Sequence, residues 1–118
     1  MKTSELSGAA LDWAVAEAEG FFKKDMASIR DGKVDVFYFD GYEPSNDWAL
    51  GGSIIEREGM TLRCGLHGWD AELPEFGVVT NGTTPLIAAM RCYVESELGD
   101  EVQIPEELLN DKAKNETA

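Results

Sequence analysis

The sequence lacks the residue patterns on which most catalytic and metal sites depend. It contains a single histidine, His67, and only two cysteines, Cys64 and Cys92, at no spacing typical of zinc ligands. It has no phosphate-binding P-loop, no dinucleotide-binding glycine pattern and no nucleophile elbow. We therefore expect no metal, no cofactor and no catalytic activity. So few cysteines suit a reducing cytoplasm, and we expect both thiols to be reduced and mostly buried.

Basic residues are also scarce. The chain of 118 residues has 10 Lys and Arg against 23 Asp and Glu, which gives a formal net charge of −13 at pH 7. Such a surface repels phosphates, so it argues against direct nucleic-acid binding and favours solubility or a basic protein partner. No apolar run approaches the ~18 residues of a membrane helix, and the start lacks the pattern of a secretory signal. We expect neither a membrane span nor a signal peptide.

Residues 42–58 form the stretch richest in residues that are neither plain core nor plain surface. Asp47 is expected to cap or clasp a turn, because its carboxylate accepts from nearby N–H groups. Gly51 and Gly52 indicate either a positive φ or a close approach by backbone or ligand. Ser53 would then cap a short helix that carries two isoleucines inward and an acid-base-acid end outward. Trp48 leaves two interpretations open, a tight connection anchored in the core or a binding loop held by that anchor.

The N-terminal part predicts a helix over residues 4–20, started by Ser4 or Ser7 and ended by Gly20. One face repeats Leu11, Val15, Ala18 and Phe22. Trp13 falls nearly opposite Leu11, among small residues, where a helix with one buried face has no reason to place tryptophan. Either this helix is covered on both sides within the domain, or the Trp13 face meets another subunit or a ligand.

The rest of the chain alternates between extended and helical patterns. Residues 21–33 predict a solvated basic face ending in an Asp31-Gly32 turn. Strands are predicted over 34–39, 60–64, 69–73 and 76–80, with the second and third forming a hairpin. The best helix start follows, with Thr83 or Thr84 as cap and Pro85 in the first position, and Gly99 ends this core helix. An edge strand over 100–104 and a short helix over 105–109 complete the prediction.

These elements predict an α+β fold in which two main helices pack on a small, mainly antiparallel sheet. We expect a single domain over residues 1–109, followed by a flexible polar tail over 110–118, where apolar anchors are lacking.

Three segments carry a resemblance to a known family. They are the run from Asp47-Trp48-Ala49 through Gly51-Gly52 to Ile54-Ile55-Glu56-Arg57, the run Ser4–Ala16, and the run Thr84–Tyr93 continuing to Gly99-Asp100-Glu101. Together they resemble the NinX family of small proteins of tailed phages and prophages. The resemblance implies a phage origin and a location in the host cytoplasm. It implies no activity.

A candidate anion site combines features of two segments. A helix that begins behind Thr83 and Thr84 exposes N–H groups that favour an anion. Arg91, less than two turns along, would either pair with Glu95 or add a bidentate grip on a phosphate or carboxylate. Trp48 would stack on a base. The candidate ligand-binding residues are Asp47, Trp48, Gly51, Gly52, Arg57, Thr83, Thr84 and Arg91.

The function that we predict is that of a non-catalytic phage accessory protein. It would bind a small anionic ligand, such as a host signalling nucleotide, or a host protein. The alternative is an acidic mimic of nucleic acid that inhibits a basic host protein, although the acids are spread evenly along the chain. A homo-oligomer that uses the Trp13 face is a further expectation.

Overall fold

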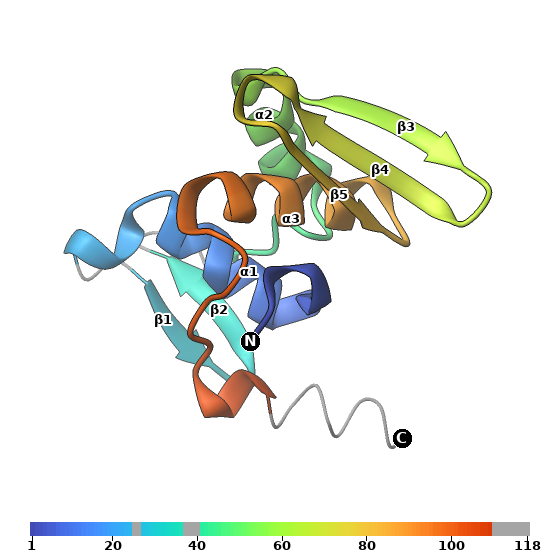
Figure 1. Ribbon diagram of the computed structural model, residues 1–118. Coiled ribbons are helices and arrows are strands. Elements are labelled where there is room, and N and C mark those ends of the chain that lie inside the picture. The colour runs from blue at the N-terminus through green and yellow to red at the C-terminus, as the bar shows by residue number, and fades with distance from the viewer. Residues whose placement is uncertain (25–26, 37–40, 110–118) are drawn as a thin grey trace.

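The computed structural model of the protein describes residues 1–24, 27–36 and 41–109 (Figure 1). Its helices are α1 (Gly8–Ala18), α2 (Trp48–Glu58) and α3 (Pro85–Leu98), with 3-10 turns η1 (Thr3–Glu5), η2 (Phe21–Lys24) and η3 (Pro74–Phe76) and a final helical turn over 106–109. Within these ranges, β1 (Ala27–Arg30) and β2 (Lys33–Val36) form one antiparallel sheet, and β3 (Thr61–Gly65), β4 (Gly68–Leu73) and β5 (Val78–Gly82) form another. The predicted α+β class is confirmed, with the strands divided between two sheets.

Helix α3 lies at the centre of the molecule. The sheet β3-β4-β5 packs on one side of it, and α1 packs on the other (Figure 1). Its start is as predicted, because Thr84 caps it by accepting from the Ile87 N–H at 3.1 Å and Pro85 takes the first turn. Met90 and Val94 are fully buried. α3 therefore links the two halves of the core.

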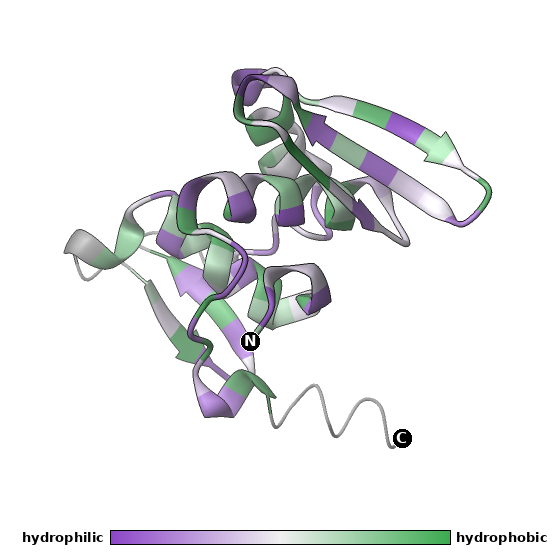
Figure 2. Ribbon diagram, in the orientation of Figure 1, coloured by the Kyte–Doolittle hydropathy of each residue, from purple (hydrophilic) through white to green (hydrophobic). Residues whose placement is uncertain are grey.

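The three-stranded sheet follows its sequence pattern closely. The β3–β4 hairpin is confirmed and pairs Leu62 with Ala71. Hydropathy alternates along β4, so that one face of the strand meets α3 (Figure 2). The strand predicted over 76–80 begins only at Val78, because η3 and a positive φ of 67° at Gly77 turn the chain first. Cys92 is buried as expected, but the expectation for Cys64 is wrong, because β3 is an edge strand and leaves that thiol exposed.

The β1–β2 hairpin was only partly predicted. Asp31 and Gly32 have φ of 53° and 72°, so the predicted turn is the two-residue, left-handed connection that suits a tight hairpin. The prediction of a solvated face over 21–33 missed β1, which pairs residue by residue with β2. The strand predicted over 34–39 corresponds to β2. Residues 37–40 and the predicted flexible tail at 110–118 lie outside the described residues.

The chain ends differ from their predictions. The helix predicted over 4–20 begins only at Gly8, because Leu6 and Ser7 are extended and Leu6 turns into the core. The edge strand predicted over 100–104 is reduced to one antiparallel bridge between Lys2 and Glu101. Around that bridge the Thr3 N–H donates to the Asp100 carbonyl at 2.9 Å. The first residues of the chain are thereby held against the segment that follows α3.

Candidate functional site

The start of α2 contains four of the predicted site residues. Asp47 caps the helix, accepting from the Ala49 N–H at 2.9 Å, as the sequence indicated. Gly51 is buried, and a Cβ there would collide with the Pro44 carbonyl oxygen and the Leu86 side chain. The close approach that the glycines predicted is therefore real, and it joins the first turns of α2 and α3. It is filled by protein rather than open to a ligand.

Two expectations for this stretch are wrong. Ser53 caps no helix, because α2 already begins at Trp48, and the Ser53 hydroxyl instead donates to the Ala49 carbonyl at 2.7 Å. Trp48 is no core anchor, since 56% of its surface is exposed. Its ring lies along α2 beside the half-buried Gly52. An exposed tryptophan on a rigid helix is available to a partner, but it does not hold a loop in place.

In the middle of α3, Arg91 already uses donors of its guanidinium on backbone carbonyls of the chain. Its Nε donates to the Leu6 carbonyl at 2.7 Å and its Nη1 donates to the Asn81 carbonyl at 2.9 Å. Burial lowers the pKa of the guanidinium. Arg91 thus ties the N-terminal segment to the end of β5. Thr83 is exposed, and the Thr84 hydroxyl is occupied in capping.

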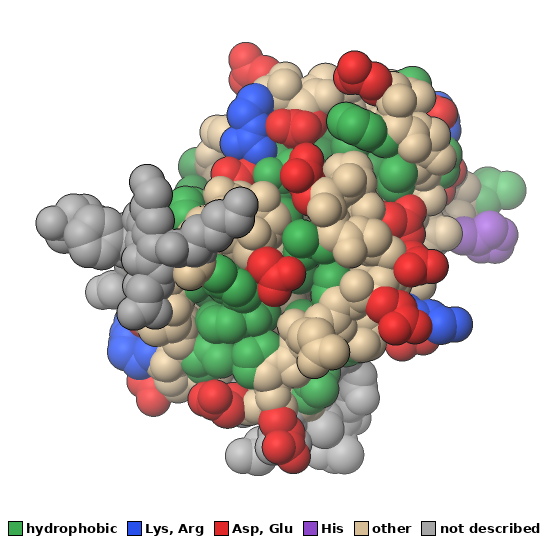
Figure 3. All heavy atoms as spheres, turned by 60° about the vertical axis from the view of Figure 1, so that its left-hand side comes forward, with side chains coloured by type: hydrophobic (Ala, Val, Ile, Leu, Met, Phe, Trp, Pro, Cys, Tyr) green, Lys and Arg blue, Asp and Glu red, His purple; other side chains and the backbone are tan. Residues whose placement is uncertain are grey.

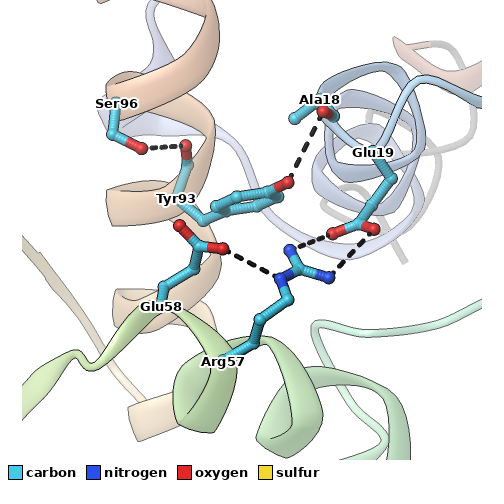
Figure 4. A network of polar contacts seen from close by, with 6 residues as sticks. All are labelled: Ala18, Glu19, Arg57, Glu58, Tyr93 and Ser96. Carbon is cyan, nitrogen blue, oxygen red and sulfur yellow. Dashed lines mark hydrogen bonds and ion pairs between the residues drawn. The ribbon is translucent and has the colours of Figure 1, made fainter.

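Arg57 is the centre of a polar network where α1, α2 and α3 meet (Figure 4). Its Nη1 and Nη2 donate to both carboxylate oxygens of Glu19, at 3.3 Å and 2.6 Å, and its Nε donates to Glu58 at 2.8 Å. The guanidinium lies 5.5 Å from the centre of the Tyr93 ring. The hydrogen bonds to Glu19 and Glu58 raise the pKa of Arg57. These contacts hold the last turn of α2 against α1 and α3.

The two arginines therefore do not form one anion grip. Arg91 and Tyr93 are two residues apart on α3, which places them about 200° apart around the helix axis. Arg57 contacts the side of α3 that carries Tyr93, whereas Arg91 faces Leu6 and Asn81. The structure brings the first turns of α2 and α3 together at Gly51 and leaves the predicted arginines on different sides of α3.

Asp12 is a buried carboxylate that the sequence reasoning missed. Only 4% of it is exposed, and it accepts from the Ser45 N–H at 2.9 Å. Burial raises its pKa to about 7. The available signal was an aspartate whose neighbours one turn on, Val15 and Ala16, are apolar, which places it on a covered part of α1. Asp12 fastens the segment before α2 onto α1.

The surface is hollowed where α1 meets the segment 101–105. One depression, of about 340 Å³, is lined by residues that include Met1, Leu98 and Glu101. Its neighbour, of about 330 Å³, is lined by Trp13, Phe22, Ile104 and Pro105. Glu17 and Gln103 line both depressions. We call these two adjoining depressions the α1 groove.

Trp13 forms the aromatic wall of the α1 groove. Its ring centre lies 4.5 Å from that of Phe22, and both side chains are half-buried. Phe22 covers one part of the Trp13 side chain, which partly explains why a tryptophan occupies this face of α1. The exposed part of the side chain lines the groove. The oligomer predicted through this face stays a prediction.

Among the described residues, no three His, Cys, Asp or Glu side chains are close enough to hold a metal ion. His67 lies exposed in the β3–β4 turn. None of the helices described is long and apolar enough to cross a membrane.

The fold and these contacts define a small α+β protein built around a central helix, with an acidic surface and an open groove beside α1. The model of the family described as bacteriophage P22 NinX matches residues 2–97. The chain therefore belongs to the NinX family, as the three sequence segments indicated. A search of curated proteins found no match.

Proposed function

We propose that this protein is a non-catalytic phage accessory protein that acts in the host cytoplasm by binding a host protein. The proposal rests on one observation, which is that the two arginines predicted to bind an anion already bind other groups of the protein. Arg57 is bound to Glu19 and Glu58, and Arg91 is bound to two backbone carbonyls. An anionic ligand would have to displace these contacts, whereas a protein partner needs only surface that is already exposed.

The charge of the chain supports the same choice. With 23 acidic and 10 basic residues, the surface attracts basic partners and accelerates their encounter. Family membership supplies the phage setting. It supplies no activity, so the kind of partner must be argued from the surface itself.

The acidic mimic of nucleic acid is supported less well. A mimic requires rows of unpaired carboxylates, and Asp70 and Glu72 do share one face of β4. However, Glu72 pairs with Arg63 at 3.1 Å, which interrupts that row. A general protein contact therefore fits the described surface better than phosphate mimicry.

The test is native mass spectrometry of the tagged protein purified from a phage-infected host, compared with the same sample after denaturation. We expect a complex of reproducible stoichiometry with one host protein. The tag expressed alone under the same infection is the control. A nucleotide-sized mass that is lost on denaturation would overturn the proposal in favour of a small anionic ligand, and an unliganded monomer or homo-oligomer would overturn both.

A further inference from the structure

The α1 groove has two chemically different ends. Towards Met1 it is lined by Glu17 and Glu101, and towards Pro105 it is lined by Trp13 and Phe22. Glu17 lies where the two depressions join. A ligand that fills both ends must therefore present a cation and an apolar group side by side.

The acidic end is not neutralised from within the described chain. None of the described cations forms an ion pair with Glu17 or Glu101. Met1 lines the same end, but its ammonium donates to the Val102 carbonyl at 2.9 Å. Glu101 is exposed and is the backbone bridge partner of Lys2, whereas Glu17 lies deeper in the groove wall. Glu17 is half-buried, and a partly desolvated carboxylate gains from a cationic partner.

The aromatic end suits an apolar or cationic side chain. Trp13 and Phe22 present tilted rings to the groove, with an interplanar angle of 48°. Tryptophan is enriched among the residues that dominate binding at protein interfaces, and the face of its ring also attracts arginine and lysine. Figure 3 brings this side of the molecule forward and shows hydrophobic side chains in the middle of the visible face, with acidic ones among them and basic ones at its margins.

We propose that the α1 groove binds a basic, amphipathic peptide segment of a partner protein. A lysine or arginine of that segment lies over Glu17, and an apolar neighbour packs on Trp13 and Phe22. Charge complementarity selects this occupant, because none of the described cations pairs with the carboxylates of the groove, in a chain of net charge −13. The inference rests on the proposed function and names the surface and partner chemistry through which it operates.

The first test uses a short blocked peptide that alternates arginine and leucine, with a glutamate-leucine peptide as its control. In ¹H–¹⁵N spectra of the full chain, the indole N–H of Trp13 is expected to shift on titration, while that of Trp48 stays in place. Trp13→Phe assigns the signal. Glu17→Gln is expected to weaken binding about fivefold, since one partly buried ion pair is lost.

Glu75→Gln is the matched control, because Glu75 is an exposed acid of η3 and its substitution changes the net charge equally. We expect it to weaken binding less than about twofold, as for a distant screened charge. Equal losses in the two variants would show attraction to net charge alone and overturn the groove. A shift of Trp48 without Trp13 would also overturn it.

Native mass spectrometry then separates this inference from the proposed function. If the wild-type chain carries a host protein and Glu17→Gln loses it while Glu75→Gln keeps it, both stand. If all three carry the partner equally, the proposed function stands and the groove is overturned as its docking site. If the wild-type chain carries no protein, the proposed function fails whatever the peptide titration shows.

Discussion

Glu17 and Glu19 lie two residues apart at the end of α1, and the surroundings of their carboxylates are opposite in kind. Glu19 is held by both terminal nitrogens of Arg57, and only 16% of its side chain is exposed. Glu17 lines the α1 groove, where none of the described cations pairs with it. The spacing sends the two side chains to opposite sides of the helix. One carboxylate closes the junction of the helices, and the other stays available on an open surface.

The largest expected difference between the two sides concerns their aromatic residues. Tyr93 in the junction is 4% exposed, so Tyr93→Ala is expected to lower the free energy of unfolding by about 3–5 kcal/mol. Trp13 in the groove is half-buried, and Trp13→Ala is expected to cost less than half as much. Urea unfolding of both variants measures the difference. Equal losses would show that the groove wall is as tightly packed as the junction.

Asp12 is a third acidic residue of α1, and unlike Glu17 it is buried and hydrogen-bonded. Its folded-state pKa of about 7 lies above the usual 3.8, so the folded protein binds the extra proton between those values. Stability is therefore expected to fall as pH rises from 5 to 8, by roughly 2–3 kcal/mol from this group. Asp12→Asn removes the charge and should flatten that part of the profile.

Thermal unfolding followed at pH 5, 6.5 and 8 tests this expectation. Asp35 provides the matched control. Its hydrogen bond with the Gly41 N–H and its pairing with Arg30 lower its pKa, so its contribution is lost only as pH falls below the usual range. Asp35→Asn should leave the slope between pH 5 and 8 unchanged. A wild-type profile that rises over this range would contradict the assignment to Asp12.

The two glutamates themselves give a smaller effect. Glu19→Gln should lower the free energy of unfolding by about 1 kcal/mol, because Arg57 is half-exposed and the pair is partly screened. Glu17→Gln should change it by less than about 0.5 kcal/mol, because Glu17 forms no ion pair with any of the described cations. Repeating both measurements in 1 M NaCl should shrink the Glu19 effect. A large loss for Glu17→Gln would mean that its carboxylate has a structural role.

The features that could be predicted from the sequence are those whose interacting residues lie close together in the chain. The Thr84 cap, the Pro85 start and the β3–β4 hairpin depend on residues close in the chain, and all are found. The junction depends on Arg57 and Glu19, which are separated by 38 positions, and no local pattern selects that partner. Asp12 and Ser45 are separated by 33 positions. Family membership needed only the order of short segments along the chain, so it was predictable where these contacts were not.

The candidate site shows the same limit. Asp47 as cap and Gly51 as close approach were predicted because backbone geometry demands those residue types. The roles of Arg57 and Arg91 were not, since an arginine side chain is long enough to reach a ligand, a carboxylate or a carbonyl with equal ease. The α1 groove was signalled only by Trp13 on an unexpected face. Its other wall comes from the opposite end of the chain, which no local pattern could place there.

A further small effect on stability is expected for Trp48, the exposed tryptophan of the predicted site. More than half of its surface is exposed, and alanine is the better helix former, so Trp48→Ala should change the free energy of unfolding by less than about 1 kcal/mol. If the partner binds only in the α1 groove, the variant should also keep the host complex. Urea unfolding and native mass spectrometry of the same preparation decide this. Loss of the complex without loss of stability would move the contact surface from α1 to the start of α2, and the contrast between Glu17 and Glu19 would then be one of folding alone.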